Sequence, residues 1–120
     1  GDFPLRVIAG SAKKRRLKTP GDMTVRPTAD RVKEALYNIL GDRVPQSSFL
    51  DLYAGTGNIG IEALSRGAAS AVFVEQEHQN TRLIVENLKI TGFLGRSRII
   101  RRPVKEGLKL LGAEGLKLFP

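Results

Sequence analysis

The chain contains no cysteine, and His78 is its only histidine among 120 residues. Without cysteine it can form neither a disulfide framework nor a cysteine-based zinc site. A single histidine offers little for a histidine metal site or for a Ser-His-Asp triad. His78 lies in a polar stretch, so we expect it at the surface and without a metal.

Long apolar segments are also missing. No apolar run approaches the roughly 20 residues that span a bilayer, and residues 1–4 lack the apolar segment of a signal peptide. No internal repeat or low-complexity tract occurs. With 41% hydrophobic and 27% charged residues, the composition is that of an ordinary globular chain. These features predict a soluble cytoplasmic protein with no membrane partner.

Positive charge is abundant and unevenly distributed. The formal net charge is +8, and residues 1–33 carry nine Lys and Arg against three Asp, whereas the other 87 residues carry eleven basic against nine acidic residues. A basic segment beside a nearly neutral body indicates a surface for a polyanion such as nucleic acid. The alternative is a solvated basic arm that aids solubility.

The basic segment should fold as a hairpin followed by a helix. Residues 5–9 and 15–18 read as two strands around a turn at 10–12, with Lys and Arg at the tip. A helix should follow Pro27, with Thr28 as its N-cap and Gly41 as its end. Its expected apolar face consists of Val32, Ala35, Leu36, Ile39 and Leu40.

Strands and helices alternate from Phe49 onward, which predicts an α/β fold with a parallel sheet and right-handed crossovers. We therefore divide the chain into a basic hairpin-and-helix region over residues 1–45 and an α/β domain over residues 46–120. The first strand would normally be central, so three strands leave one of its edges bare, and bare apolar edges tend to pair with other chains. The expected strands are 49–53, 71–74 and 97–101, and the expected helices are 59–65, 80–89 and 104–111.

A glycine-rich turn follows the first strand in the run Asp51-Leu-Tyr-Ala-Gly55-Thr-Gly57-Asn-Ile-Gly60. Glycines between a strand and a helix permit positive φ angles and the close approach of a ligand. Asp51 suits a ligand with an ammonium group, such as the methionine part of S-adenosylmethionine, and is awkward beside a pyrophosphate. Glu75 ends the next strand, where a carboxylate can bind ribose hydroxyls. A dinucleotide and a purely structural turn remain alternatives.

Three segments carry a family resemblance. They are the opening Arg6-Val-Ile-Ala-Gly10-Ser with Arg15-Arg16-Leu17, the run from Arg26-Pro27-Thr28 to Leu40, and Leu50 to Gly57 continuing through Leu64-Ser65-Arg66-Gly67-Ala68 to Glu75. With these segments the chain is similar to the bacterial 16S ribosomal RNA guanine-N2 methyltransferase family. The resemblance implies a Rossmann-like class I fold that uses S-adenosylmethionine, here cut after about three parallel strands, and a monomeric full-length protein.

The resemblance also implies roles for matched positions. The methionine end of the cofactor would lie at Asp51, Gly55 and Gly57, and its ribose at Glu75. Gln76 would lie beside the adenine. The segment from Arg26 to Arg31 would lie over the opening through which cofactor and substrate enter. The full set of expected cofactor-binding residues is Asp51, Tyr53, Gly55, Thr56, Gly57, Glu75, Gln76, Arg26 and Thr28. 16S ribosomal RNA, or the assembling small subunit, would contact Lys13, Lys14, Arg15, Arg16, Lys18 and Arg31.

Some of these side chains also have plainer interpretations. Arg31 and Lys33 could form a solvated helix face, and Lys105 and Lys109 read as a solvated stripe. Tyr37 reads as a core residue rather than as a platform for a base.

Two departures from the family pattern stand out. Pro103 occupies the place of an acid that bonds the adenine amine, and proline offers neither a donor nor a side-chain acceptor. The Asn/Asp-Pro-Pro-aromatic motif of amino methyltransferases is absent from the sequence. That motif orients the exocyclic amine of an unstacked guanine, so we expect this chain alone to be inactive.

Three hypotheses follow for the function. The chain is part of a guanine-N2 methyltransferase for 16S ribosomal RNA, a non-catalytic module that binds RNA and S-adenosylmethionine, or a dinucleotide-dependent oxidoreductase. We also expect this chain to associate with itself through the bare edge of its sheet.

Overall fold

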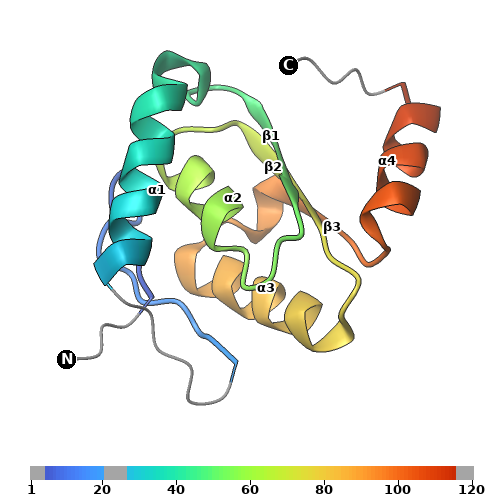
Figure 1. The fold of residues 1–120 in the computed structure, drawn as a ribbon, viewed down its shortest axis with the longest axis horizontal. Coiled ribbons are helices and arrows are strands. Elements are labelled where there is room, and N and C mark those ends of the chain that lie inside the picture. The colour runs from blue at the N-terminus through green and yellow to red at the C-terminus, as the bar shows by residue number, and fades with distance from the viewer. Residues whose placement is uncertain (1–4, 21–26, 116–120) are drawn as a thin grey trace.

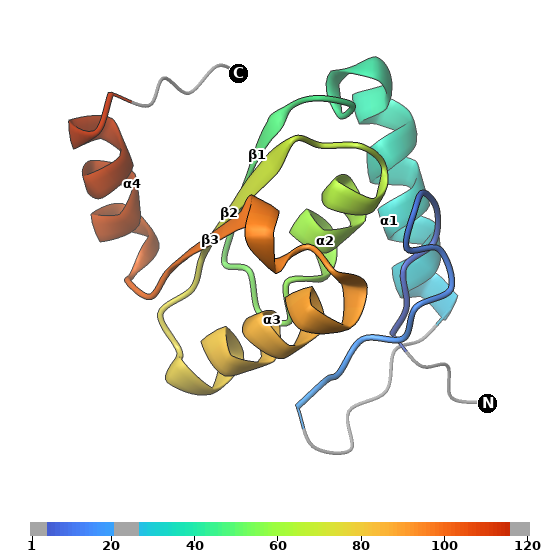
Figure 2. The ribbon, with the colours of Figure 1, turned by 180° about the vertical axis from the view of Figure 1, so that it is seen from behind.

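The sheet and its helices form three layers in a computed structural model that describes residues 5–20 and 27–115. Helices α1, α2 and α3 lie on one side of the sheet and α4 on the other (Figures 1 and 2). No helix in these ranges is long and apolar enough to cross a membrane. The elements are α1 (Pro27–Leu40), η1 (Gly41–Arg43), β1 (Ser48–Leu52), α2 (Asn58–Ser65), β2 (Ser70–Val74), α3 (His78–Thr91), η2 (Leu94–Arg96), β3 (Ser97–Ile100) and α4 (Val104–Ala113).

The three strands are parallel in the order β1-β2-β3. Asp51 pairs with Phe73, and Phe73 pairs with Ile99, so the carboxyl ends of β1 and β2 lie level with each other. This confirms the α/β alternation predicted from the sequence. β1 pairs only with β2 among the described residues, and association of two chains at its other edge remains a prediction.

Side chains of β2 alternate between two hydrophobic clusters, because successive residues of a strand point to opposite faces. Phe73 is fully buried among Ile61, Ile84 and Leu88 of α2 and α3. Val74 packs on the other face with Ile100 and Leu111, as α4 covers that side. The larger cluster therefore holds α2 and α3 in place directly behind the glycine-rich turn.

The basic hairpin exists, but its strand pairing is shorter than the sequence predicts. Val7 exchanges backbone hydrogen bonds with Lys14 and Arg15, and Leu17 N–H donates to Leu5. Regular β-pairing is nevertheless limited to one antiparallel bridge between Arg6 and Arg16. The reason is that the next donors, Ile8 N–H and Ala9 N–H, bind the Glu62 carboxylate instead of the opposite strand.

Gly10 fastens the tip of the hairpin to α2. Its φ of +86° lies in the region that glycine favours, and a Cβ at this position would lie 1.8 Å from the Ser65 carbonyl oxygen. Ser11 N–H donates to that same oxygen at 2.8 Å. No other residue could bring the turn so close to the helix.

Helix α1 corrects two sequence predictions. It begins at Pro27, so Thr28 lies within the first turn and is not the N-cap. Its buried face carries Lys33 and Tyr37, whereas Val32 and Ile39 of the predicted apolar face are 63% and 77% exposed. The helix is turned this way because Lys33 meets a buried carboxylate and the Tyr37 hydroxyl donates to Ile59 O.

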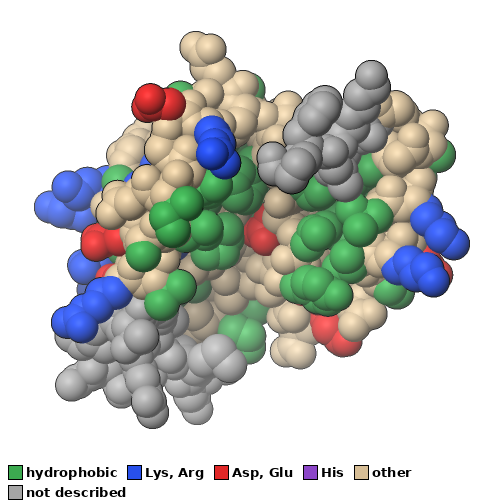
Figure 3. Space-filling view, turned by 45° about the horizontal axis from the view of Figure 1, so that its top comes forward, with side chains coloured by type: hydrophobic (Ala, Val, Ile, Leu, Met, Phe, Trp, Pro, Cys, Tyr) green, Lys and Arg blue, Asp and Glu red, His purple; other side chains and the backbone are tan. Residues whose placement is uncertain are grey.

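The exposed side of α1 contributes to an apolar surface. Figure 3 shows hydrophobic side chains gathered over the part of this face that carries α1 and β1, with Lys and Arg side chains along its margin.

Tyr37, on the buried side of α1, is 3% exposed and stacks on Phe49 with ring centroids 6.3 Å apart. The interpretation of Tyr37 as a core residue is therefore confirmed.

Candidate functional site

Two carboxylates meet at the carboxyl edge of the sheet, which is where open α/β sheets bind ligands. Asp51 lies near the end of β1, and Glu75 directly follows β2. The turn between β1 and α2 runs between them and contains Gly55 and Gly57. The sequence predicted this convergence, because neighbouring parallel strands end at the same edge.

The turn contains three residues with positive φ angles. Tyr53, Gly55 and Gly57 have φ of 55°, 58° and 83°. Tyr53 is unusual in this region, since residues with a Cβ rarely adopt it outside turns and functional sites. A Cβ at Gly55 would meet nothing closer than Tyr53 O at 4.0 Å, so the backbone there is open to a ligand.

Asp51 is a buried carboxylate with few partners. It is 6% exposed, and its Oδ2 accepts Gly60 N–H at 2.9 Å. Burial raises the pKa of Asp51 to about 7; the Gly60 N–H opposes this rise, and the charge of Glu75 adds to it. No Lys or Arg of the described ranges forms an ion pair with Asp51. A cationic ligand group would supply the missing positive charge.

Glu75 braces the turn from the second strand. Its Oε1 accepts Gly55 N–H at 2.8 Å, and its Oε2 accepts Glu77 N–H at 2.9 Å. Each carboxylate oxygen has two acceptor positions, so each keeps one for a ligand hydroxyl. Glu75 also holds the backbone of Gly55, a contact that the sequence did not indicate.

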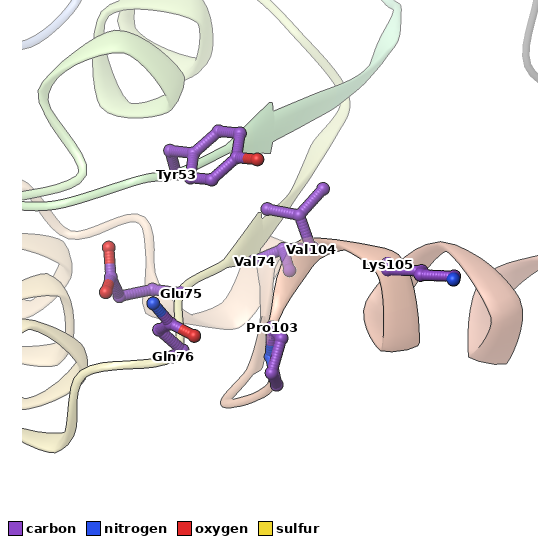
Figure 4. Close-up of a pocket in the computed structure, with 7 residues that line it drawn as sticks. All are labelled: Tyr53, Val74, Glu75, Gln76, Pro103, Val104 and Lys105. Carbon is purple, nitrogen blue, oxygen red and sulfur yellow. The ribbon is translucent and has the colours of Figure 1, made fainter.

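A cavity of about 290 Å³ opens beside Glu75. Figure 4 shows the Tyr53 ring on one side, Pro103 and Val104 on another, and the Lys105 ammonium directed away along α4. A slot with apolar walls and a carboxylate at one end is suited to a nucleoside, whose base is flat and whose ribose carries hydroxyls. The residues that line the cavity are Tyr53, Val74, Glu75, Gln76, Pro103, Val104 and Lys105.

The expected cofactor residues divide between this cavity and the turn. Tyr53, Glu75 and Gln76 line the cavity, whereas Asp51 lies behind the turn. The backbone carbonyl of Thr56 accepts the Asn87 amide of α3 at 3.0 Å, and its Oγ1 accepts Asn58 N–H at 3.3 Å. Arg26 lies outside the described residues, and so does the side chain of Thr28.

The expected RNA-binding side chains project from the hairpin into solvent. Lys13, Lys14, Arg15 and Arg16 are all exposed, while Leu5, Val7 and Leu17 turn inward. Lys18 is exposed as well, but its ammonium lies 3.1 Å from Glu86 of α3. Arg31 is exposed on α1. The hairpin therefore presents a run of four consecutive basic side chains to solvent.

His78, Lys105 and Lys109 are exposed, as predicted. His78 also has a partner that the sequence did not indicate, because its Nδ1 lies 2.7 Å from Arg101 Nη1.

A buried ionic cluster behind the turn was not predicted. Lys33 and Glu62 are 2% and 0% exposed and lie 3.1 Å apart, and Arg66 Nε donates to Glu62 at 2.8 Å. The interpretation of Lys33 as a solvated residue is wrong. A sequence signal did exist, since Glu62 lies inside the otherwise apolar run from Ile61 to Leu64 of α2.

The pKa values in this cluster reflect two opposing effects. Burial lowers the pKa of Lys33, while the charge of Glu62 and its hydrogen bond oppose that change. Burial alone would raise the pKa of Glu62, but hydrogen bonds from Ile8 N–H and Arg66 and the charge of Lys33 outweigh it, so this pKa is lowered. Ile8 N–H and Arg66 thus favour the Glu62 carboxylate, with a smaller contribution from Lys33, and Glu62 partly offsets the effect of burial on Lys33.

The sheet order, the glycine turn after β1 and the acid after β2 define a Rossmann-like class I methyltransferase fold. Hypothetical protein TTHA0928 from Thermus thermophilus superposes with a TM-score of 0.79 and 36% identity, over 93% of this chain and 63% of that one. The C-terminal domain of precorrin-6Y C5,15-methyltransferase from Rhodobacter capsulatus shares the fold, with a TM-score of 0.67 and 19% identity, over 91% of this chain and 53% of that domain.

Over residues 5–116 the chain matches the family described as conserved hypothetical protein 95, and it belongs to that family. Ribosomal RNA small subunit methyltransferase D of Escherichia coli (strain K12) is 37% identical over 100 residues, which are 83% of this chain and 50% of that protein. The chain thus spans about half the length of the curated relatives it matches. The resemblance inferred from the three sequence segments is confirmed.

Asp51→Asn should stabilise the chain at high pH. The pKa of Asp51 is raised from 3.8 to about 7, so the folded state holds a proton that the unfolded state releases, and the contribution of this group to stability falls as pH rises through that interval. Asparagine keeps an oxygen for Gly60 N–H and carries no charge. We expect its free energy of unfolding in urea to exceed that of the wild type by about 1–2 kcal/mol near pH ~8, and by less near pH ~4.5.

The matched control is Asp42→Asn, which removes an exposed aspartate of η1. It should change stability little at either pH. A loss of stability in Asp51→Asn at high pH, relative to this control, would contradict the assignment of Asp51 as an uncompensated buried charge.

Gly60→Ala and Gly55→Ala should differ in their effect on folding. A Cβ at Gly60 would lie 2.4 Å from a Phe73 ring carbon, so we expect a loss of about 2–3 kcal/mol from overpacking. Gly55→Ala meets open space and should lose only about 1 kcal/mol, from the positive φ. Urea unfolding of both variants tests this, and equal losses would show that Gly60 is not held against the core.

Proposed function

We propose that this chain supplies the S-adenosylmethionine site of a methyltransferase that modifies small-subunit ribosomal RNA at the exocyclic N2 of a guanine. The observation that carries the proposal is Asp51, a buried carboxylate with a raised pKa beside a turn that leaves backbone open to a ligand. The relative in Escherichia coli is named a small-subunit ribosomal RNA methyltransferase, and its name supports the substrate class.

The residues of the site fit the chemical groups of S-adenosylmethionine. The Asp51 carboxylate suits the ammonium of the methionine part, because it has no cationic partner among the described side chains. The free acceptor positions of Glu75 suit the two ribose hydroxyls. The cavity between Tyr53, Gln76 and Pro103 suits the adenine. When bound, this cofactor would supply an electrophilic methyl group.

Pro103 determines how the adenine base would be held in the cavity. Its ring lines the cavity, where the family pattern has an acid that accepts from the adenine amine. We expect apolar contact with Pro103 and Val104 to hold the base, with polar recognition left to Gln76 and to backbone groups. Affinity should therefore depend more on the two carboxylates than on the adenine amine.

A dinucleotide is the weaker alternative. The pyrophosphate of such a cofactor rests at the amino end of the helix that follows the glycine turn, and here Oδ2 of Asp51 already accepts Gly60 N–H in the first turn of α2. A negative charge close to that position would repel a pyrophosphate.

The hairpin is the proposed RNA contact. Lys13, Lys14, Arg15 and Arg16 are exposed next to one another, and phosphate contacts from such side chains supply affinity without sequence specificity. The choice of guanine would then depend on residues that hold the base. The motif that does so in amino methyltransferases does not occur in residues 1–120, so we propose that this chain binds both ligands and does not itself methylate RNA.

A calorimetric titration with S-adenosylhomocysteine tests the cofactor site. The wild type and the Asp42→Asn control should bind, and Asp51→Asn should bind at least about tenfold more weakly, because a charge-assisted hydrogen bond is lost. Wild-type affinity should rise with pH through about 7, since Asp51 must lose its proton to pair with an ammonium. Binding of NADH in preference to S-adenosylhomocysteine would refute the cofactor assignment.

Salt dependence of RNA binding tests the hairpin. In the double variant Lys13→Gln, Arg16→Gln, the slope of log K against log salt for a 16S ribosomal RNA fragment should fall by about 1.5–2. The matched control is Lys89→Gln, Lys109→Gln, which removes two exposed lysines of α3 and α4. An equal loss in both double variants would mean that the hairpin is not the contact surface.

A further inference from the structure

Both arms of the basic hairpin are tied to the glycine turn by buried polar side chains. Arg6 and Lys18 belong to opposite arms, and each offers backbone groups to a side chain that also binds the turn. The two side chains are Lys33 of α1 and Asn87 of α3. Neither lines the cofactor cavity, and neither is exposed to RNA.

Lys33 connects the first arm to the amino end of α2. Its Nζ donates to Arg6 O and to Asn58 Oδ1, each at 2.7 Å. Asn58 is the first residue of α2 and directly follows Gly57. The same ammonium lies 3.1 Å from Glu62, which in turn binds Ile8 N–H and Ala9 N–H. A displacement of this arm would therefore also displace Asn58, the residue that directly follows the turn.

Asn87 connects the second arm to the other side of Gly57. It is fully buried, and its Oδ1 accepts Lys18 N–H at 2.7 Å. Its Nδ2 donates to Lys18 O and to Thr56 O, both at 3.0 Å. Thr56 and Asn58 flank Gly57, so Lys33 and Asn87 hold the residues on either side of this positive-φ glycine.

These links are costly to break, because the side chains of Lys33 and Asn87 are themselves buried. A buried polar group that loses its partner keeps its desolvation penalty, and hydrogen bonds at low dielectric are stronger than those at the surface. The hairpin and the turn are consequently restrained to move together. A ligand that orders one of them reduces the entropy that the second ligand must still remove.

We propose that Lys33 and Asn87 are positioning residues that couple RNA binding at the hairpin to cofactor binding at the glycine turn, so that each ligand strengthens the other. The proposal rests on the proposed function, because it takes RNA and S-adenosylmethionine as the two ligands. It requires reciprocity: RNA must raise the affinity for the cofactor by the same factor as the cofactor raises the affinity for RNA.

The test measures the dissociation constant of S-adenosylhomocysteine by calorimetry, with and without a saturating 16S ribosomal RNA fragment. The coupling ratio is the dissociation constant without RNA divided by the dissociation constant with RNA. For the wild type we expect a ratio of about five or more. Asn58→Ala removes the acceptor at the turn and should bring this ratio close to one while each ligand still binds alone. Asn58→Asp keeps an acceptor for Lys33 and should restore the ratio. A purely structural role for Asn58 would lower stability without changing the ratio.

Lys33→Met provides a second measurement, since it keeps the buried stem and removes the ammonium. It should also bring the ratio close to one, and the exposed Lys89→Met is its matched control. If Lys33→Met does not fold, the two Asn58 variants decide the matter. Wild type that binds both ligands with a ratio of one, or a ratio unchanged in Asn58→Ala, would overturn the coupling alone. Wild type that binds neither ligand would overturn the proposed function and the coupling with it.

Discussion

The carboxylate of Glu62 is the point on which the rest of the structure depends. It is fully buried on α2 and accepts hydrogen bonds from Ile8 N–H, Ala9 N–H and Arg66 Nε, with the Lys33 ammonium 3.1 Å away. Three segments therefore converge on one side chain: the hairpin, α1 and α2. Removing one partner from a buried ion pair leaves an uncompensated charge, which is far more destabilising than replacing the whole pair.

The two buried acids Glu62 and Asp51 differ in how many hydrogen-bond donors the protein gives them. Glu62 has donors from several directions, and its pKa is lowered despite burial. For Asp51 the structure gives the N–H of Gly60 as donor, and its pKa is raised to about 7. Both carboxylates lie in the same small domain, so burial alone does not distinguish them. The number of hydrogen-bond donors distinguishes them, because a buried carboxylate with few donors gains most from a cationic ligand.

The site is built so that the element that binds RNA in our proposal does not touch the cofactor cavity. The basic side chains of the hairpin project into solvent, and the cavity lies at the carboxyl edge of the sheet. Hydrogen bonds from the buried side chains of Lys33 and Asn87 connect the hairpin to the glycine turn and the start of α2. Such bonds transmit small displacements, because packed interiors have low compressibility.

The local pattern of the chain was sufficient to predict much of this arrangement. The alternation of strand and helix predicted the parallel sheet, and parallel strands necessarily bring Asp51 and Glu75 to one edge. The same alternation predicted a helix over residues 80–89, which lies within α3 (His78–Thr91). It could not show that Asn87 would bind Lys18 and Thr56, because those partners come from segments far apart in the sequence.

The sequence by itself determined the class of fold, the glycine turn and the two acids that flank it, since each follows from the order and spacing of neighbouring residues. Only the tertiary structure decided which face of α1 is buried. Periodicity favoured Val32 and Ile39, but the buried positions are occupied by Lys33 and Tyr37. The physical reason is that the Lys33 ammonium pairs with the buried Glu62 carboxylate and the Tyr37 hydroxyl donates to Ile59 O of α2. Both contacts arise only when α1 and α2 pack together.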